Sequence, residues 1–270
     1  MHQRQPNQRK SEVSSKTVVP RIIHQVWIGG EPPNEIAKYL KTVPEVNSSF
    51  EYFLWDEQKL LNDFCKQFPN QKDTISQLLN LQIFNAAKVD LIRFIILLEI
   101  GGVYIDADFE FLNPIPHLFL ESEVILAAEP FGITNALIGM TPQHPLAINL
   151  VEQIWSNICH MSITSSNVVS TTGPVQLQKM IKSFDLYTKY KTFIFPPHSL
   201  GLVPFQKRIF LKKFYDNSNF NDNLPADIIA VHHYQNSWKT GNNSFVSSAL
   251  YSIKSYLLRK FLSVNHRKKS

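Results

Sequence analysis

Two aspartates separated by a single residue are the side chains best placed for chemistry. Asp106 and Asp108 follow Val103–Ile105, whose β-branched and aromatic residues predict a short buried strand. In an extended segment, side chains two residues apart point to the same side, so both carboxylates can face one site. Carboxylates this close repel unless a cation lies between them, and oxygen ligands suit Mg²⁺ or Mn²⁺. Isolated Asp-X-Asp triplets are also common in solvated turns, so the neighbouring sequence is needed to distinguish a metal site from such a turn.

The segment that positions these aspartates is unusually apolar. Ala86–Ile100 predicts a helix buried on most sides, because its apolar residues are too dense for a surface helix. Asp90 and Arg93 interrupt it and share one helical face, since they are three positions apart. Ionised groups in such a helix need a partner or a polar cavity, so they form either an internal ion pair or part of a binding site. Gly101 and Gly102 then end the helix.

From Ala86 to Asp108 the chain follows the pattern A-x-x-x-D-x-x-R-x-x-x-L-x-x-x-G-G-x-Y-x-D-x-D. This pattern resembles the sugar-binding, DxD-containing glycosyltransferase family. Relatives of that type include α-1,6-mannosyltransferases, inositolphosphoceramide mannosyltransferases, capsular-polysaccharide transferases and, more distantly, clostridial glucosylating toxins. The resemblance implies a GT-A fold, a nucleotide-sugar donor bound through Mn²⁺ or Mg²⁺, and transfer of the sugar with retention of its anomeric configuration.

The resemblance also implies roles for individual residues. Asp108 would hold the metal, Asp106 would lie near the ribose or the metal, and Asp90 and Arg93 would bind hydroxyls of the donor sugar. These four residues are therefore the catalytic candidates. The expected donor-binding residues are Trp27, Asp90, Arg93, Tyr104, Asp106, Asn135, Gly173, Ser237 and Trp238, and the expected metal ligands are Asp106, Asp108 and His233.

Several of these candidates have a plainer explanation. Asn135 is otherwise a turn residue, and Gly173, in Thr-Thr-Gly-Pro, otherwise precedes a helix as part of its N-terminal cap. His233 belongs to a segment similar to the family's ending H-x-x-x-S-W, but the adjacent His232 could take its place. Without the resemblance, the two histidines would be a surface pair and Trp238 a core residue.

An opening strand is predicted at residues 20–29, which resemble the start of family members. Trp27 lies near its end, where the crevice rule for open α/β sheets places a ligand. His24 and Gln25 lie within the strand. A lone histidine in a strand is more often a hydrogen-bonded core residue than a ligand, so we expect a core role for His24.

The chain has 270 residues, 44% of them hydrophobic and 12% aromatic, which is enough for one large α/β domain. We expect a GT-A type fold with a Rossmann-like mixed sheet flanked by helices. We expect a disordered lead-in at 1–18, the GT-A domain at 19–242 and a basic amphipathic helix with its tail at 243–270. Further strands are expected near 50–55, 124–128, 135–140 and 228–231, and further helices near 57–67, 74–80 and 145–158.

The net charge of +5 is concentrated at the end of the chain, because no acidic residue follows Asp227. Residues 243–270 combine basic residues with apolar ones at helical spacing, which predicts either a peripheral membrane contact or a helix packed on the domain. Cys65 and Cys159 lack metal-ligand spacing and indicate a reducing compartment. Residues 1–18 lack an apolar core, and no stretch approaches roughly 18 consecutive apolar residues. We therefore expect a cytoplasmic enzyme.

The expected function is metal-dependent, retaining transfer of a hexose from GDP-mannose or a UDP-sugar to a glycan, glycolipid or protein acceptor. A glycoside hydrolase is one alternative, although its two carboxylates lie roughly 5 to 9 Å apart across the sugar, an arrangement that DxD does not predict. A module that binds a nucleotide sugar without catalysis is another. The basic tail alone suggests nucleic acid, but no recognised motif accompanies it, and we expect no nucleic-acid partner.

Overall fold

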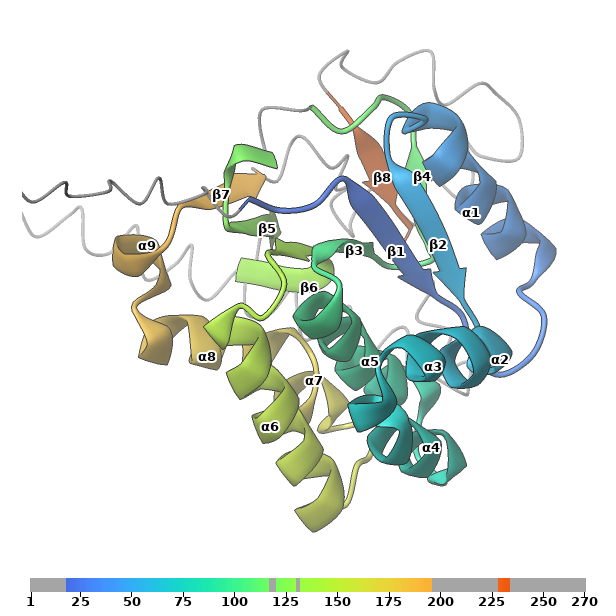
Figure 1. Cartoon of the computed structure of the whole chain (residues 1–270), viewed down its shortest axis with the longest axis vertical. Coiled ribbons are helices and arrows are strands. Elements are labelled where there is room, and N and C mark those ends of the chain that lie inside the picture. Colours follow the sequence, from blue (N-terminus) through green and yellow to red (C-terminus); the bar gives the residue numbers. More distant parts are fainter. Residues whose placement is uncertain (1–17, 117–119, 130–131, 196–227, 234–270) are drawn as a thin grey trace, which may run out of the picture.

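A computed structural model describes residues 18–116, 120–129, 132–195 and 228–233 (Figure 1). The sequence expectations for the lead-in, for Ser237 and Trp238, and for the C-terminal helix and tail lie outside these residues. No helix within the described part of the chain is long and apolar enough to cross a membrane.

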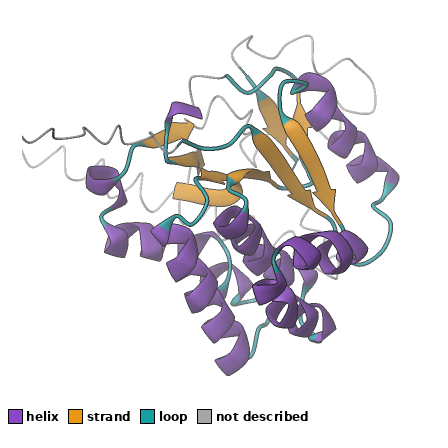
Figure 2. Cartoon of the chain, in the orientation of Figure 1, coloured by secondary structure: helices purple, strands orange, loops and turns teal. Residues whose placement is uncertain are grey.

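A six-stranded mixed sheet forms the centre of the molecule, and helices flank it (Figure 2). Its strand order is β2-β1-β3-β6-β5-β7. The strands are β1 (Ile22–Val26), β2 (Glu51–Trp55), β3 (Gly102–Ile105), β5 (Val124–Glu129), β6 (Gly132–Met140) and β7 (Thr192–Phe195). β1 pairs in parallel with β2 and β3, β7 pairs in parallel with β5, and β6 is antiparallel to its neighbours β3 and β5. The predicted α/β class with a mixed sheet is confirmed.

The side chains of β3 alternate between two apolar cores, as the period of two in a strand requires. Val103 and Ile105 belong to a core shared with Val43 of α1 (Asn34–Val46). Tyr104 belongs to the larger core, which is built mainly on α5 (Asn85–Glu99). In Figure 1, α5 and α6 lie on one side of the sheet and α1 lies on the other.

Helix α5 is buried along most of its length, as its composition predicts. Leu91, Ile92 and the residues from Phe94 to Leu97 are fully buried. It contacts α4 (Lys72–Asn80) and α6 (Pro145–His160). The helices that follow α6 are α7 (Val168–Thr171), α8 (Pro174–Phe184) and α9 (Leu186–Lys189). Between β2 and α4 run α2 (Glu57–Lys59), the π-helical turn η1 (Leu60–Phe64), α3 (Cys65–Gln67) and the 3₁₀ turn η2 (Pro69–Gln71).

A second, two-stranded sheet follows the two aspartates directly. β4 (Phe109–Phe111) pairs antiparallel with β8 (Ala230–His232), and Phe109 lies opposite His232. This pairing returns a segment from the far end of the chain to the residues just after Asp108. The small sheet therefore brings the His-His pair to the exit of β3.

Candidate functional site

The aspartate turn at the end of β3 is held by hydrogen bonds of its own backbone. The Asp106 N–H donates to the carbonyl of Ala136 at 2.8 Å, and the Gln25 side-chain amide donates to the carbonyl of Asp106 at 3.0 Å. Gln25 in turn accepts a hydrogen bond from the Tyr52 hydroxyl at 2.9 Å. Three strands thus fix the turn, so the two carboxylates project from a rigid base.

Asp106, Asp108 and His232 form a cluster that could hold a metal ion. One potential ligand atom from each residue lies within 4.8 Å of the others, and His232 Nε2 is 3.3 Å from Asp108 Oδ1. The imidazole of His232 stacks on Phe109 with ring centroids 4.4 Å apart. Two carboxylates and one imidazole are a donor set that suits a divalent ion such as Mn²⁺.

His232 occupies the place that the sequence analysis gave to His233. Successive residues of an extended segment point to opposite sides, so only one of the two histidines can face the aspartates. His233 Nε2 instead lies 2.9 Å from Glu110 Oε2, and its ring stacks on Tyr39. The sequence motif located the pair, but the choice between its members follows from the strand register.

Burial and neighbouring charges shift the pKa of Asp106 in this cluster. Burial raises the pKa of Asp106 to about 6, while the Arg93 guanidinium lowers it and the neighbouring Asp108 carboxylate raises it. With Asp90, Asp106 and Asp108 ionised, three negative charges face one positive charge on Arg93. A bound divalent cation would balance the remainder, so the residues present fit such an ion.

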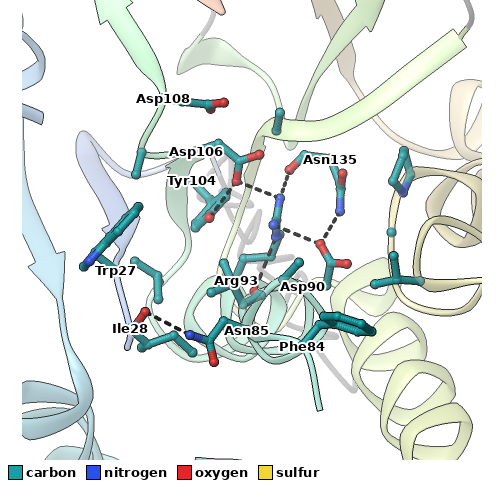
Figure 3. Close-up of a pocket in the computed structure, with 18 of the residues that line it drawn as sticks. Trp27, Ile28, Phe84, Asn85, Asp90, Arg93, Tyr104, Asp106, Asp108 and Asn135 are labelled. Atoms are coloured by element: carbon teal, nitrogen blue, oxygen red, sulfur yellow. Dashed lines mark hydrogen bonds and ion pairs between the residues drawn. The ribbon is translucent and has the colours of Figure 1, made fainter. Parts of the chain in front are cut away.

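Arg93 is the buried centre of the polar network behind the aspartates (Figure 3). Its guanidinium lies 2.9 Å from Asp90 Oδ1 and 3.2 Å from Asp106 Oδ1. It also lies 4.5 Å from the centre of the Tyr104 ring, whose hydroxyl donates to Asp106 Oδ1 at 2.8 Å. The internal ion pair between Asp90 and Arg93 is therefore confirmed, and it extends to the first aspartate of the DxD motif.

The Asp90 carboxylate has three polar partners among the described residues. In addition to Arg93, Asn135 Nδ2 donates to its Oδ1 at 2.8 Å and Thr172 Oγ1 donates to its Oδ2 at 2.7 Å. Burial raises the pKa of Asp90, and the charge of Arg93 and these two hydrogen bonds oppose that rise. Thr172 was missed as a site residue. Its neighbours Gly173 and Pro174 were recognised as a helix start, but nothing in that motif indicates a partner in α5.

A break in the pairing of β5 with β6 explains the position of Asn135. Leu126 lies opposite Ile138 whereas the next residue, Ala127, lies opposite Thr134, so residues 135–137 bulge away from β5. The bulge leaves the Asn135 carbonyl to accept a hydrogen bond from Arg93 Nη1 and the side chain to reach Asp90. Bulges re-aim side chains in this way at many active sites.

A pocket of about 540 Å³ opens beside this network. Its walls come from the ends of β1 and β3, the bulge of β6, the start of α5 and the start of α8. The predicted residues that line it are Trp27, Asp90, Arg93, Tyr104, Asp106, Asp108, Asn135 and Gly173, and His232 joins them. One cavity thus combines the polar network with the metal-capable cluster.

The wall formed by the end of β1 is positioned by polar contacts. The Trp27 indole N–H donates to the carbonyl of Gly30 at 2.9 Å, and Asn85 Nδ2 donates to the carbonyl of Ile28 at 3.2 Å. Figure 3 shows Trp27, Ile28 and Asn85 together at one side of the cavity. The start of α5 and the end of β1 are therefore linked at this side of the pocket.

His24 has a core role, as expected. Its Nε2 lies 3.0 Å from the carbonyl of Gly101, and the Trp55 indole N–H donates to its Nδ1 at 3.2 Å. Since the indole can only donate, Nδ1 accepts and the proton of the neutral ring resides on Nε2. Burial lowers the pKa of His24 to about 4. His24 therefore supports the Gly101–Gly102 turn that leads into β3.

Comparison with known proteins agrees with the sequence motifs. Residues 33–131 match the family described as "Glycosyltransferase sugar-binding region containing DXD motif". The chain is 25% identical over 210 residues to inositol phosphoceramide mannosyltransferase 2 of Schizosaccharomyces pombe, covering 77% of this chain and 57% of that protein. It is 28% identical over 192 residues to the uncharacterized glycosyltransferase L373 of Acanthamoeba polyphaga mimivirus, covering 69% of this chain and 71% of that protein.

A further relative is the mannosyl phosphorylinositol ceramide synthase CSH1 of Saccharomyces cerevisiae, 24% identical over 172 residues, or 63% of this chain and 44% of that protein. The chain spans about half the length of these mannosyltransferases. Among solved structures, the UDP-bound glycosyltransferase domain of the YGT toxin is 13% identical, with a TM-score of 0.47 over 66% of this chain and 80% of that domain.

Proposed function

The chain belongs to the glycosyltransferase family with a DXD-containing sugar-binding region, and we propose that it transfers a hexose from a nucleotide sugar in a metal-dependent reaction. The observation that carries this proposal is the shared cavity. Asp106, Asp108 and His232 face it from one side, and Asp90 and Arg93 face it from another. This arrangement suits a ligand that has a diphosphate at one end and sugar hydroxyls at the other.

The first part of the proposal concerns the diphosphate. Asp106, Asp108 and His232 would hold Mn²⁺ or Mg²⁺, and the bound ion would supply positive charge to stabilise the departing nucleotide. Arg93 holds the Asp106 carboxylate in place through an ion pair of 3.2 Å. Tyr104 donates to the same oxygen, so the orientation of Asp106 is fixed before a donor arrives.

The second part concerns the sugar. Among the residues that the structure describes, Asp90 binds Arg93, Asn135 and Thr172. Two carboxylate oxygens offer about four acceptor positions, so these contacts leave one for a hydroxyl group. Within the described residues, the contacts of Arg93 occupy Nε, both hydrogens of Nη1 and one hydrogen of Nη2. The other Nη2 hydrogen can be donated to the sugar. The ion pair and the binding role are therefore compatible.

The choice of donor, product configuration and acceptor is also proposed. Mannosyltransferases among the relatives favour GDP-mannose as the donor, with a UDP-sugar as the alternative. The resemblance of the motif favours retention of configuration. We propose a glycan, a glycolipid or a protein as the acceptor, and the word ceramide in the names of those relatives supports the glycolipid.

Donor hydrolysis by the purified protein tests the proposal without knowledge of the acceptor. GDP-mannose and UDP-glucose are incubated with the protein in Mn²⁺, in Mg²⁺ and in excess chelator, and the released nucleotide is quantified by chromatography. We expect slow release from one donor only, dependent on the metal, and a released sugar whose first-formed anomer by NMR matches the donor. Hydrolysis of an aryl mannoside with no turnover of either nucleotide sugar would instead identify a glycoside hydrolase.

A further inference from the structure

Three side chains behind the proposed metal site, Glu110, His233 and Tyr39, form what we term the brace. We propose that the brace fixes the separation of Asp108 and His232 before a metal binds, which makes Glu110 and His233 positioning residues for metal affinity. The inference rests on the proposed function, because it concerns the same metal site. It assigns a role to the histidine that does not face the aspartates.

The two outer ligands of the site lie at one end of the small sheet. Asp108 immediately precedes β4, and His232 is the last residue of β8. Phe109 pairs with His232, and the His233 N–H donates to the Asp108 carbonyl at 3.0 Å. The distance between the two ligands is therefore set by the register of β4 against β8.

The small sheet is too short to fix this register by its length alone. Each of its strands has three residues, and two-stranded pairs are marginally stable in water by themselves. A slip of one residue would turn His232 away from the aspartates and bring in a neighbour. Contacts between side chains therefore add to the backbone hydrogen bonds that hold the two strands in place.

The brace supplies such contacts on one face. His233 Nε2 lies 2.9 Å from Glu110 Oε2, and the two side chains are only 11% and 24% exposed. This link joins the residue after β8 to β4 on one face, while His232 stacks on Phe109 on the other. The pairing is thus secured on both faces of the small sheet.

Helix α1 supports the brace from outside. The Tyr39 ring stacks on His233 with centroids 4.1 Å apart and planes 5° apart, and the Tyr39 hydroxyl donates to Glu35 Oε1 at 2.9 Å. One turn later, Thr42 Oγ1 accepts a hydrogen bond from the Phe111 N–H at 2.9 Å. The helix therefore contacts β4 and the residue that follows β8.

Metal binding by the full chain with Mn²⁺ alone tests this inference. Free Mn²⁺ is measured by electron paramagnetic resonance during titration of the wild type, Glu110→Ala, Glu110→Gln and Tyr39→Leu. We expect about tenfold weaker binding for Glu110→Ala, the size typical of lost outer-shell partners. Glu110→Gln should restore most of the affinity, because its amide oxygen can accept a hydrogen bond from an imidazole N–H. Tyr39→Leu, which keeps an apolar side chain but removes the stack, should weaken binding in the same direction.

The matched control is Glu121→Ala, which removes the exposed ion pair between Glu121 and Lys191, whose charged atoms are 3.4 Å apart. This variant should leave Mn²⁺ binding unchanged. Equal affinity of Glu110→Ala and the wild type would overturn the inference and leave the proposed function intact. A lower melting temperature with unchanged affinity would overturn it as well, since the brace would then serve stability alone. If the wild type itself does not bind Mn²⁺, the proposed metal site fails and the inference fails with it.

Discussion

Acidification should destabilise the fold through His24, because this histidine is buried in its neutral form. Its Nε2–H faces the Gly101 carbonyl and its Nδ1 faces the Trp55 indole N–H, so a second ring proton would point at a donor. Burial lowers the pKa of His24 to about 4, whereas the unfolded chain has the ordinary value of 6.5. Between these two values the unfolded state binds a proton that the folded state does not, so stability falls as the pH falls.

The size of the effect follows from the difference between the two pKa values of His24. At 1.36 kcal/mol per pKa unit, the folded state loses about 2 kcal/mol by pH 5 and about 3 kcal/mol once the pH is below 4. Above pH 7 both states carry a neutral ring, and the contribution no longer changes. For a domain of ordinary stability this is a large fraction of the total.

Urea unfolding at several values between pH 7.5 and pH 4.5 measures this loss when the wild type is compared with His24→Gln. The variant removes the titrating group and keeps a donor for the Gly101 carbonyl, so its lower stability should depend less on pH. The difference between the two curves isolates His24, because the carboxylates and His144, whose pKa is also lowered by burial, titrate in both proteins. Parallel curves would refute the argument.

Three further changes separate structure from function. Asp90→Ala should lower the free energy of unfolding by about 3 kcal/mol, since Arg93 keeps Asp106 as a partner. Donor turnover, measured below the melting temperature of the variant, should fall far more than the small unfolded fraction can explain. Thr172→Val should cost about 1 to 2 kcal/mol by leaving one Asp90 oxygen without its 2.7 Å donor, and a calorimetric titration should show weaker donor binding. The membrane contact that residues 243–270 predict as one of two possibilities is tested by deletion of residues 252–270, which should abolish preferential co-sedimentation with anionic over neutral vesicles. Equal recovery of the intact chain with both vesicle types would favour the other possibility, a helix packed on the domain.

Local sequence signals were sufficient for the elements that carry the DxD motif. The dense apolar run of α5, the Gly101–Gly102 turn and the β-branched residues of β3 each indicate their structure from neighbouring residues alone. The order of strand, helices and strand from β2 to β3 predicts parallel strands, and both β2 and β3 run parallel to β1, which lies between them. Asp106 and Asp108 could be assigned to one site because strand periodicity is a local property.

Helix α1 was missed although its sequence carries a signal. Ile36, Tyr39, Leu40 and Val43 follow helical spacing and are buried, but the prolines that flank and interrupt them suggest a loop. Pro33 precedes the helix, where a missing N–H is tolerated, and Pro44 lies in its last turn. The positions of these prolines, rather than their presence, decide the structure.

Contacts between distant segments could not be obtained from local patterns. The three-residue strand β4 is too short to show periodicity, and its pairing with β8 joins residues more than a hundred positions apart. The choice of His232 over His233, the bulge at Asn135 and the hydrogen bond from Thr172 to Asp90 all depend on such pairings. These features arise from register and packing, which only the folded chain defines.

The most direct test of metal-dependent transfer is donor turnover by Asp108→Asn. This variant keeps the size of the side chain but removes one of the two carboxylates of the metal-capable cluster. In the presence of Mn²⁺, we expect nucleotide release to fall to the level of the wild type in excess chelator, while the melting temperature stays close to that of the wild type. Turnover by Asp108→Asn equal to that of the wild type, or wild-type turnover that survives the chelator, would contradict the account.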